Sequence, residues 1–581
     1  MTREDDAKKA WREHCKSAVR KFVMTAVVID NEAKLDSQSE DETANKPEMK
    51  VAVSHDDGLA GGYSQEANDS QCQESDLSDE RNDTARDNEL YIRPISDAFA
   101  EEGITCSFVL PNRTITDKPA ILERTLKAAT ISDIVIIDWY LSDKDPAVTK
   151  EILEKIARDD TEKEKGRLRL ICVYTGQTDH GMDTVLEDAC AALEKGGLKF
   201  DHIDKESGSA QGKHYSLIVL SKKKVSGNEL PPLLLDALAD IAEGLLPSFA
   251  LAAVAAIRRN VHHIITRFPR GLDAAYVANR LITDPPGDVA QLLRELFVSE
   301  CDTALGLEKV ADNYLGKRVI SDWLKERPVS TENFKIKNKP VDREFLECLN
   351  QNGFSGKKVI FDDNNPLTIK EEKRSQISFA IHGSAELAKE GERAFARLVA
   401  LKREAFGNTK IVSDNRWRPS LTLGTILSQE VDAETFIYYY CLTPACDTVR
   451  LYDDKRKFIL MELKKANEVK GKKTNLIIGH LANESIKLFF DPQPYLITTF
   501  WFEGDQETGR VMAEASPEAS PDEKTFYFNS ADSDPVKLQW LGEVRRNRAT
   551  RDMAELNRQW LQFGIGDSEY LRLAAKGSAT L

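Results

Sequence analysis

The chain has 581 residues, of which 41% are apolar and 30% are charged, and its formal net charge is −16. This length exceeds what one hydrophobic core usually organises, so we expect two to four domains. The longest weakly polar run, residues 244–257, is shorter than the roughly 20 residues of a membrane helix and contains Pro247. The first residues also lack the apolar core of a signal peptide. These features exclude membrane-spanning classes, and we expect a cytoplasmic protein without a membrane partner.

Negative charge is concentrated in residues 36–89, which hold sixteen Asp or Glu, four Lys or Arg and few large apolar residues. Such a composition buries too little apolar surface to offset the entropy lost on ordering. We therefore predict a disordered acidic insertion in this segment. The remainder of the chain is close to neutral, so global acidity says little about partners.

On either side of this insertion, apolar runs alternate with amphipathic segments. Strands are predicted at residues 22–29, 105–110, 132–138, 168–175 and 215–221, and helices at residues 91–104, 119–129, 148–159 and 182–195. Strands that alternate with helices predict a parallel sheet covered on both faces, with its chemistry at the carboxyl ends of the strands.

The rest of the chain divides into three further regions. Apolar residues at helical spacing form one stripe over residues 233–268, which fits a core helix and a signalling or dimerisation helix equally well. Seven short apolar segments from residue 421 onward predict a small β barrel or sandwich, closed by a helix at residues 538–563. The predicted organisation is a doubly wound α/β domain (1–225), a helical linker (226–330), a mixed region (331–415) and a β-rich effector domain (416–581).

Polar residues follow four of the predicted strands. Asp30, Asn31 and Glu32 follow the first strand, Asp138 ends the third, Thr175 ends the fourth and Lys222 follows the fifth. The carboxyl ends of strands in a parallel doubly wound sheet converge, so these side chains are expected to line one pocket. Aspartyl phosphorylation needs a nucleophilic carboxylate, a divalent cation, a hydroxyl and an ammonium group, and these residues supply that set.

The ordered set of four strand ends resembles the receiver domain of bacterial response regulators. Val-Val-Ile-Asp30-Asn31-Glu32 is similar to the acidic turn of that family, and Ile-Ile-Asp138-Trp-Tyr-Leu is similar to its phosphoacceptor strand. Val-Tyr-Thr175-Gly and Val-Leu-Ser-Lys222 resemble the strand ends that carry the switch hydroxyl and the lysine. The resemblance implies a flavodoxin-like fold with the sheet order 2-1-3-4-5, and it covers about 165 residues without the insertion.

The same resemblance implies a role for each residue. Asp138 would accept the phosphoryl group, while Thr175 and Lys222 would contact it. Asp30, Asp138 and the backbone carbonyl of Tyr140 would bind Mg²⁺.

Two positions depart from the family pattern. Asn31 stands where a second aspartate is usual, which removes one negative charge. The neighbouring Glu32 would compensate for it, so both residues belong to the expected metal site. A second lysine, in place of the usual proline, follows Lys222.

Other polar groupings have a structural alternative. Cys441, Cys446 and His480 suggest either a thiol catalytic pair or packed cysteines, and the nine cysteines lack the spacing of a zinc site or a disulfide framework. His262-His263 suggests either a phosphohistidine or surface residues. An arginine-rich helix near residues 545–558 suggests either a solvated face or a contact with nucleic acid.

Together these features predict a cytoplasmic response regulator of a two-component system. A histidine kinase would phosphorylate Asp138, and the helical region would pass the change to an effector of unknown output. Residues 420–573 also resemble the C-terminal region of uncharacterised bacterial receiver proteins associated with phage defence. An enzyme whose activity lies in residues 330–581 is a third alternative, but no nucleophile, base and oxyanion set can be named there, so no enzymatic activity is predicted.

The alternative is a phosphate-independent pseudo-receiver that acts as a scaffold, and Asn31 is its main support. A homodimer is a further expectation from the helical region.

Overall fold

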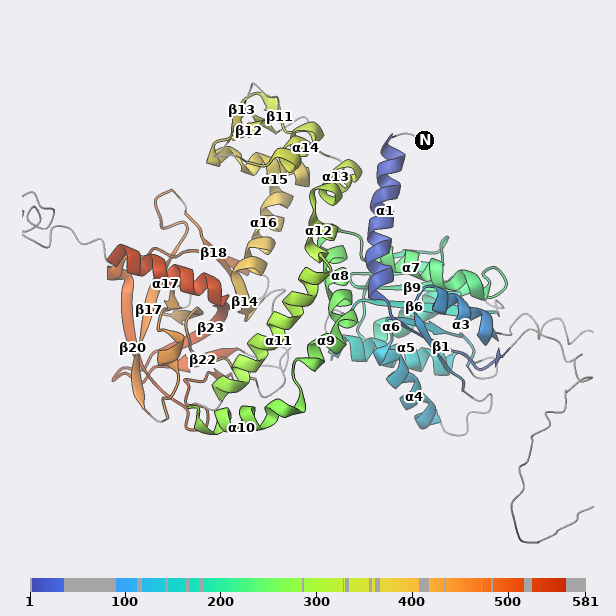
Figure 1. The fold of residues 1–581 in the computed structure, drawn as a ribbon, viewed down its shortest axis with the longest axis horizontal. Coiled ribbons are helices and arrows are strands. Elements are labelled where there is room, and N and C mark those ends of the chain that lie inside the picture. Colours follow the sequence, from blue (N-terminus) through green and yellow to red (C-terminus); the bar gives the residue numbers. More distant parts are fainter. Residues whose placement is uncertain are drawn as a thin grey trace, which may run out of the picture. The chain divides into compact units, whose positions relative to one another are not determined.

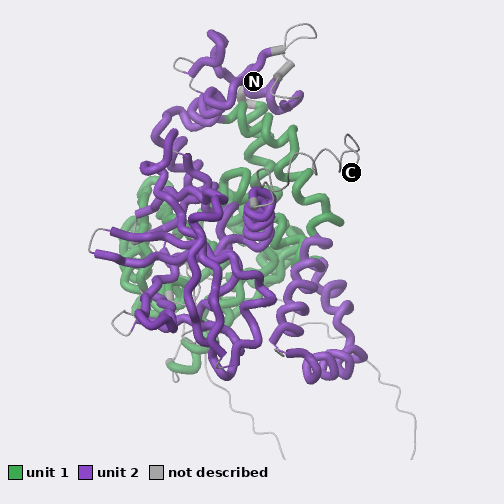
Figure 2. The backbone as a smooth tube through the Cα atoms, turned by 90° about the vertical axis from the view of Figure 1, so that its left-hand side faces the viewer, with its two compact units in different colours: residues 1–259, 305–326 green, residues 260–304, 327–581 purple. Residues whose placement is uncertain are grey.

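The structure, a computed structural model, divides the chain into two compact units (Figure 2). Unit 1 contains residues 1–259 and 305–326, and unit 2 contains residues 260–304 and 327–581. The residues that the structure describes are 3–35, 90–111, 118–141, 145–162, 167–176, 181–284, 287–327, 329, 334–354, 358–360, 366–406, 417–432, 435–452, 454–471, 473–481, 484–516 and 525–560. The predicted acidic insertion, residues 36–89, lies outside the described residues.

Unit 1 is built on a seven-stranded, mostly parallel sheet (Figure 1). Its five parallel strands are β1 (Thr25–Ile29), β4 (Thr105–Val109), β5 (Ile134–Ile137), β6 (Arg169–Thr175) and β9 (Tyr215–Ser221). They are arranged β4-β1-β5-β6-β9, which confirms the predicted order 2-1-3-4-5. Successive strand residues point to opposite faces, so Val27 and Ile29 belong to one core cluster while Ala26 and Val28 belong to the other.

A β-hairpin that was not predicted extends this sheet beyond β9. Strands β7 (Phe200–Asp204) and β8 (Ser209–Gly212) pair with each other, and β8 pairs antiparallel with β9. The sequence of β7 and β8 is largely polar and gives no clear alternation. A Cβ atom at Gly212 would lie 2.4 Å from the ring of Tyr215, so this close approach requires glycine.

Helices cover both faces of the sheet in unit 1. One core cluster lies under α4 (Lys118–Ile131), α5 (Ala147–Glu162) and α6 (Met182–Lys195), as the side chains of Leu122, Ile152 and Leu186 show. The other lies under α3 (Ile92–Glu101), the 3₁₀ turn η1 (Gly227–Glu229) and α7 (Leu230–Ile241). A short parallel pair, β2 (Ala33–Lys34) and β3 (Leu90–Tyr91), joins the two ends of the undescribed insertion.

Four more helices pack against one another and α7, and three of them contribute side chains to this second core cluster. They are α1 (Arg3–Phe22), α8 (Leu245–Arg259), α12 (Val310–Leu315) and α13 (Lys317–Glu326). Helix α1 was not predicted, although Trp11, Cys15, Ala18 and Val19 are buried at helical spacing. Its Trp11 indole donates a hydrogen bond to Glu243 over 2.9 Å.

The single helix predicted over residues 233–268 is wrong. The segment forms α7, α8 and α9 (Val261–Thr266), because Gly244 adopts a φ of +147° and Asn260 interrupts the chain again. Leu234 and Leu238 of α7 and Ala252 of α8 are buried in the core of unit 1. This part of the apolar stripe therefore belongs to core helices, which was one of the two interpretations. The predicted domain bounds stay predictions, and the 226–330 segment is shared between both units.

Unit 2 begins with helices and a small mixed region. The helices are α9, the turn η2 (Arg270–Leu272), α10 (Asp273–Ile282) and α11 (Gly287–Leu307). The mixed region contains β10 (Lys335–Ile336), β11 (Lys339–Pro340), α14 (Arg343–Asn352), β12 (Lys358–Ile360), β13 (Pro366–Thr368), η3 (Glu371–Lys373), α15 (Ser375–His382) and α16 (Ala385–Ala400).

The larger part of unit 2 is a ten-stranded antiparallel sheet. Its strands are β14 (Leu401–Glu404), β15 (Thr425–Glu430), β16 (Phe436–Cys441), β17 (Lys455–Lys465), β18 (Leu476–Leu481), β19 (Glu484–Phe489), β20 (Ile497–Glu503), β21 (Glu514–Ala515), β22 (Phe526–Asn529) and β23 (Lys537–Val544). Turns η4 (Ala445–Thr448) and η5 (Pro494–Leu496) and helix α17 (Arg546–Trp560) complete it. The α/β plus β fold class is confirmed.

This sheet is buried on both faces. Ile426 and Met461 belong to one apolar cluster, which includes residues of α17, whereas Leu427 and Leu460 belong to the cluster on the opposite face. Strand β17 pairs with β16, β19 and β20, and strand β23 pairs with β14, β15 and β22. Because each of these two strands has three partners, the described pairings form a branched sheet and do not close into a barrel.

The predicted start of the closing helix is wrong. Residues 538–544 belong to β23, and the helix begins at Arg546. No helix among the described residues is long and apolar enough to span a membrane.

A buried ion pair joins the first residue of β6 to the end of α5 in unit 1, and it yields a stability prediction. Arg169, which is 1% exposed, donates to Asp160 over 2.5 and 2.9 Å and to the carbonyl of Ala129 over 2.8 Å. Asp160→Ala would leave the guanidinium buried without its counter-ion, so we expect a loss of about 3–5 kcal/mol in the free energy of unfolding. Chemical denaturation followed by circular dichroism measures this loss.

The matched control is Glu187→Ala, which removes an exposed ion pair with Lys205 in the same unit. Exposed pairs contribute little, so this variant should unfold at nearly the wild-type midpoint. Equal midpoints for both variants would contradict the role assigned to Asp160.

Candidate functional site

Four polar residues meet at the carboxyl edge of the sheet in unit 1, and we call them the strand-end cluster: Asp30, Asp138, Thr175 and Lys222. The ammonium nitrogen of Lys222 lies 2.7 Å from Asp30 Oδ2 and 3.1 Å from Asp138 Oδ1. Strand β6, which ends at Thr175, lies between β5 and β9 in the sheet. The cluster is buried, and the Lys222 side chain is only 4% exposed.

Backbone hydrogen bonds fix each member of the cluster. The N–H of Asp138 donates to Ile29 over 2.9 Å, and the N–H of Lys222 donates to Thr175 over 2.9 Å, so the parallel ladder continues into the site. Asp30 Oδ1 accepts from the N–H of Glu32 over 2.7 Å. Asp138 Oδ2 accepts from the N–H of Tyr140 over 3.0 Å. Each carboxylate therefore has one oxygen held by the backbone and the other held by Lys222.

The charged groups of the strand-end cluster change the pKa values of Asp30 and Lys222. Burial raises the pKa of Asp30 to about 6, although the ammonium of Lys222 opposes this, and the nearby Asp138 adds to the increase. Burial alone would lower the pKa of Lys222, but the carboxylates of Asp138 and Asp30 raise it above its usual value. The buried lysine therefore stays charged at neutral pH and compensates the two acids.

Two buried polar atoms at this edge lack a hydrogen-bond partner among the described residues. They are the hydroxyl oxygen of Thr175 and the amide oxygen of Asn31. Buried polar atoms are nearly always satisfied, so unpaired ones point to a further group that completes the site. A hydroxyl and an amide oxygen suit a phosphoryl group and a cation respectively.

The predicted metal ligands are only partly assembled. Asp30 and Asp138 share Lys222. Asn31 follows Asp30 directly, and Tyr140 lies two residues after Asp138. No group of three or more His, Cys, Asp or Glu side chains suited to a metal occurs in the part of the chain that the structure describes. The expectation that Glu32 replaces a missing carboxylate stays a prediction. Two carboxylates and two amide-type oxygens still form an oxygen donor set of the kind that Mg²⁺ prefers.

Residues 22–228 match a family model described as a response receiver domain. The matched segment, called the receiver-like segment below, contains the whole strand-end cluster and the β7–β8 hairpin. Neither a search of curated proteins nor a search of solved structures found a match. The receiver-like segment supports a response-regulator-like function, for which a histidine kinase is the general partner.

The suggested thiol pair in unit 2 is not formed. Cys441 is fully buried in one apolar cluster of the sheet, and burial raises the pKa of its thiol to about 12. The ring of His480 packs against Phe436 and Tyr438, whose side chains belong to the opposite cluster. Cys446 is exposed. Cys441 and His480 are therefore packing residues, as the structural alternative expected, whereas Cys446 is not packed.

The other sequence candidates also have ordinary structural positions. His262 and His263 are exposed on α9. Within the arginine-rich helix, Arg546 pairs with Glu295 and Arg548 with Asp552. Arg558 pairs with Glu555. These arginines are thus engaged in ion pairs within unit 2, and a nucleic-acid contact stays an untested alternative.

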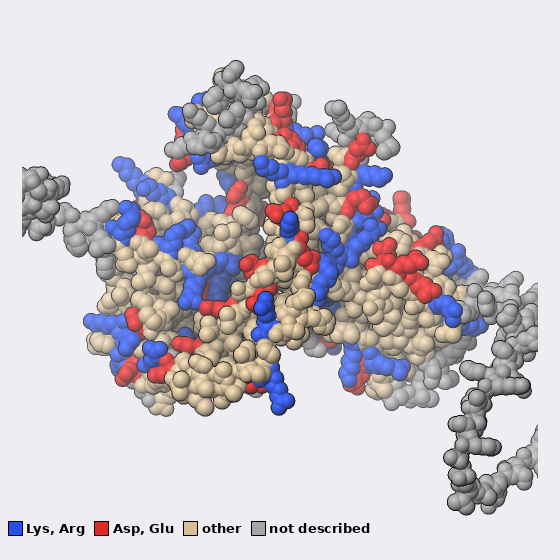
Figure 3. Space-filling model, in the orientation of Figure 1, with Lys and Arg blue, Asp and Glu red and all other residues tan. Residues whose placement is uncertain are grey.

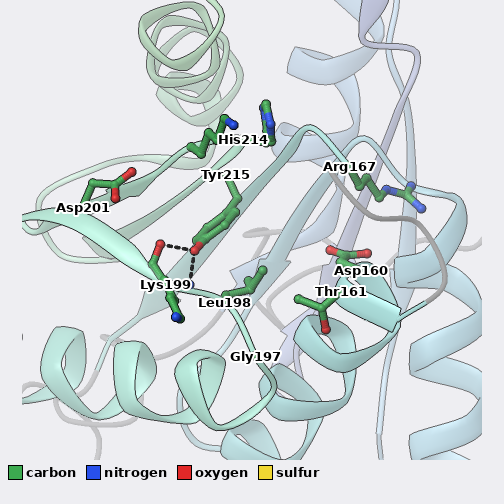
Figure 4. Close-up of a pocket in the computed structure, with 10 residues that line it drawn as sticks. Asp160, Thr161, Arg167, Gly197, Leu198, Lys199, Asp201, His214 and Tyr215 are labelled. Carbon is green, nitrogen blue, oxygen red and sulfur yellow. Dashed lines mark hydrogen bonds between the residues drawn. The ribbon is translucent and has the colours of Figure 1, made fainter. Parts of the chain in front are cut away.

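A cavity of about 310 Å³ at the opposite, amino edge of the sheet was not predicted (Figure 4). Its lining comes from the ends of α5 and α6 and from the segments before β6 and β9: Asp160, Thr161, Arg167, Gly197, Leu198, Lys199, Asp201, Lys213, His214 and Tyr215. The hydroxyl of Tyr215 is hydrogen bonded to the backbone of Lys199, so it closes one side of the cavity. The sequence carries no legible signal for this cavity, because its residues come from the separate ends of α5, α6, β7, β6 and β9 and meet only in the fold.

Lys222→Met tests the charge balance of the cluster. The ammonium lowers the pKa of Asp30, so its removal should raise that pKa further above about 6. Carbon-13 NMR of protein labelled at the aspartate carboxyls measures the titration. Lys224→Met, at an exposed position two residues away, is the control and should leave the titration unchanged. A lower pKa in Lys222→Met would overturn this account.

Proposed function

We propose that the chain is a phosphorylation-dependent response regulator in which a histidine kinase transfers a phosphoryl group to Asp138. The contact of Lys222 with Asp138 at 3.1 Å is the observation that carries the proposal. It places a buried ammonium beside the nucleophilic carboxylate, where it would stabilise the negative charge of the phosphoryl oxygens.

In the proposed step, a carboxylate oxygen of Asp138 forms a bond to phosphorus. The bond from phosphorus to the nitrogen of the phosphohistidine donor breaks, and the histidine leaves with the electron pair. Asp30, Asp138, Asn31 and the carbonyl of Tyr140 would hold Mg²⁺, which supplies positive charge for the phosphoryl oxygens. Lys222 would keep one of its contacts and move the other from a carboxylate to a phosphoryl oxygen.

Thr175 would move in response to phosphorylation of Asp138. Its hydroxyl is buried without a partner in the described residues, and donation to a phosphoryl oxygen would satisfy it. The adjacent Tyr174 donates a hydrogen bond to the carbonyl of Val225 over 2.7 Å, just before α7. A shift of Thr175 would therefore act on the segment that leads into α7, whose Leu234 and Leu238 pack in the same cluster as Tyr174.

The output would lie in unit 2. Its chemistry is not part of the proposal, because only the receiver-like segment has a family match. The resemblance of residues 420–573 to proteins associated with phage defence suggests an antiviral role for this output. The cytoplasmic location is retained as a prediction.

A phosphate-independent scaffold is the second candidate. Two observations favour it: Asn31 supplies no charge to the metal position, and Lys222 already forms an ion pair with each of the two carboxylates. In that case the receiver-like segment would bind a partner without turnover.

Phosphorylation of the full chain tests the proposal directly. With Mg²⁺ and a small-molecule phosphodonor, the wild-type protein should gain one acid-labile phosphoryl group, measured as a mass increase. Asp138→Ala should gain none, because the nucleophile is absent. Asp145→Ala, which changes an exposed aspartate in the following segment, is the control and should be modified like the wild type.

Asn31→Asp tests the metal position separately. The added carboxylate should bind Mg²⁺ more tightly, so half-maximal phosphorylation should need several-fold less Mg²⁺. A titration of phosphorylation against Mg²⁺ measures this. If the wild type and Asn31→Asp both stay unmodified while folded, and a cognate kinase also fails, the scaffold is the better account.

A further inference from the structure

The direction of the Asp138 carboxylate is set by contacts inside unit 1. Charged side chains of both signs lie over the surface that Figure 3 shows, whereas Asp138 is only 7% exposed. Asp138 follows β5 directly, and its N–H continues the sheet by donating to Ile29 over 2.9 Å. A group at this depth takes its orientation from internal hydrogen bonds, because little solvent reaches it. The contacts of its two peptide groups therefore decide where its carboxylate points.

The carbonyl of Asp138 is held by a helix and not by a neighbouring strand. The hydroxyl of Thr149, in the first turn of α5, donates to this carbonyl over 3.0 Å. Thr149 is fully buried, so water cannot replace the hydroxyl as the donor. A buried carbonyl that lost its donor would be left unsatisfied, which native structures nearly always avoid. The contact therefore fixes the peptide group that joins Asp138 to Trp139.

Two threonines of α5 use their hydroxyl groups differently. A helical threonine often bonds to the carbonyl three or four residues earlier in its own helix. Thr161, near the other end of α5, does so, because its hydroxyl donates to Ala157 over 2.9 Å. The hydroxyl of Thr149 instead bonds to a residue eleven positions earlier, at the end of β5. It therefore stabilises the strand end and not its own helix.

The start of α5 is itself fixed relative to the sheet. Val148 and Ile152, on either side of Thr149, are buried in the core cluster that also contains Ile137 and Trp139. Side chains in such a core are closely packed and have little freedom to shift. The hydroxyl of Thr149 is thus a fixed donor for the strand end.

The peptide group that Thr149 holds is the first of the turn at residues 138–140. In this turn the N–H of Tyr140 donates to Asp138 Oδ2 over 3.0 Å, while the ammonium of Lys222 lies 3.1 Å from Oδ1. Rotation of the first peptide group would move the N–H of Tyr140. The carboxylate would then lose one of the two contacts that direct it.

We propose that Thr149 is a positioning residue for phosphoryl transfer to Asp138. Its hydroxyl fixes the turn at residues 138–140 and thereby directs the carboxylate toward the phosphorus atom of the donor. Thr149 touches neither the donor nor the phosphoryl group and acts through Asp138. This inference rests on the proposed function, because it concerns the rate at which the same carboxylate reacts.

The test measures the phosphorylation rate of the folded full chain with Mg²⁺ and a saturating small-molecule phosphodonor. Thr149→Val keeps the side-chain shape without the hydroxyl, so the rate should fall about 10- to 100-fold, since misplacing a reacting group by about 1 Å can cost about 100-fold. Thr149→Ser keeps the hydroxyl and loses a methyl group, so it should react at nearly the wild-type rate. A role in packing alone predicts the reverse order, because only Ser leaves a cavity.

Amide exchange of Tyr140, followed by NMR, is a second readout that needs no phosphodonor. Its N–H is held by Asp138 Oδ2, so Thr149→Val should increase its exchange rate several-fold. The matched control is Thr161→Val, which removes a hydroxyl–carbonyl hydrogen bond at the other end of the same helix. This control should change neither the phosphorylation rate nor the exchange of Tyr140.

The outcomes separate this inference from the proposed function. A phosphorylated wild type with an equally fast Thr149→Val variant would overturn the inference alone. So would a Thr149→Ser variant as slow as Thr149→Val, or an unchanged exchange rate at Tyr140. A wild type that gains no phosphoryl group would remove the proposed function, and the inference would fall with it. If Thr149→Val does not fold, Thr149→Ala compared with Thr149→Ser gives the same test, because these two variants differ only in the hydroxyl.

Discussion

One ammonium group, that of Lys222, allows two carboxylates to be buried at the same edge of the unit 1 sheet. Asp30 and Asp138 are 1% and 7% exposed, and two uncompensated charges at such sites would each cost several kcal/mol. The lysine reaches them because β9 is separated from β5 only by β6. Strand order, core packing on both faces and the continued backbone ladder all serve to bring this nitrogen within 3.1 Å of both acids.

The strand ends could be predicted because they combine two strong signals. A buried parallel strand is a continuous apolar run, and an abrupt acidic or hydroxyl residue after it marks the carboxyl edge, as at Asp30, Asp138 and Thr175. Helix α6 was predicted at its observed bounds for a similar reason, since its buried residues repeat at helical spacing. The convergence of the residues follows from topology once the five strands are assigned.

Other elements lack such signals. The polar strands β7 and β8 are held by pairing with β9, so their structure depends on a neighbour and not on their own pattern. The break near Gly244 depends on a backbone conformation with positive φ, which apolar spacing does not reveal. At residues 538–544, Leu541 and Val544 suit a helix face as well as a strand, and tertiary pairing with β15 decides between them.

The pairing of β2 with β3 has a consequence for how the chain can vary. Ala33 and Leu90 are neighbours in a parallel bridge, so the two ends of residues 36–89 are anchored beside each other, close to Asp30. The entropy of closing a loop grows only with the logarithm of its length, and doubling the length costs about 0.6 kcal/mol. A flexible connection between two strands anchored in this way can therefore change in length at little cost to the fold, while the pairing of β2 with β3 preserves the geometry of the acidic turn.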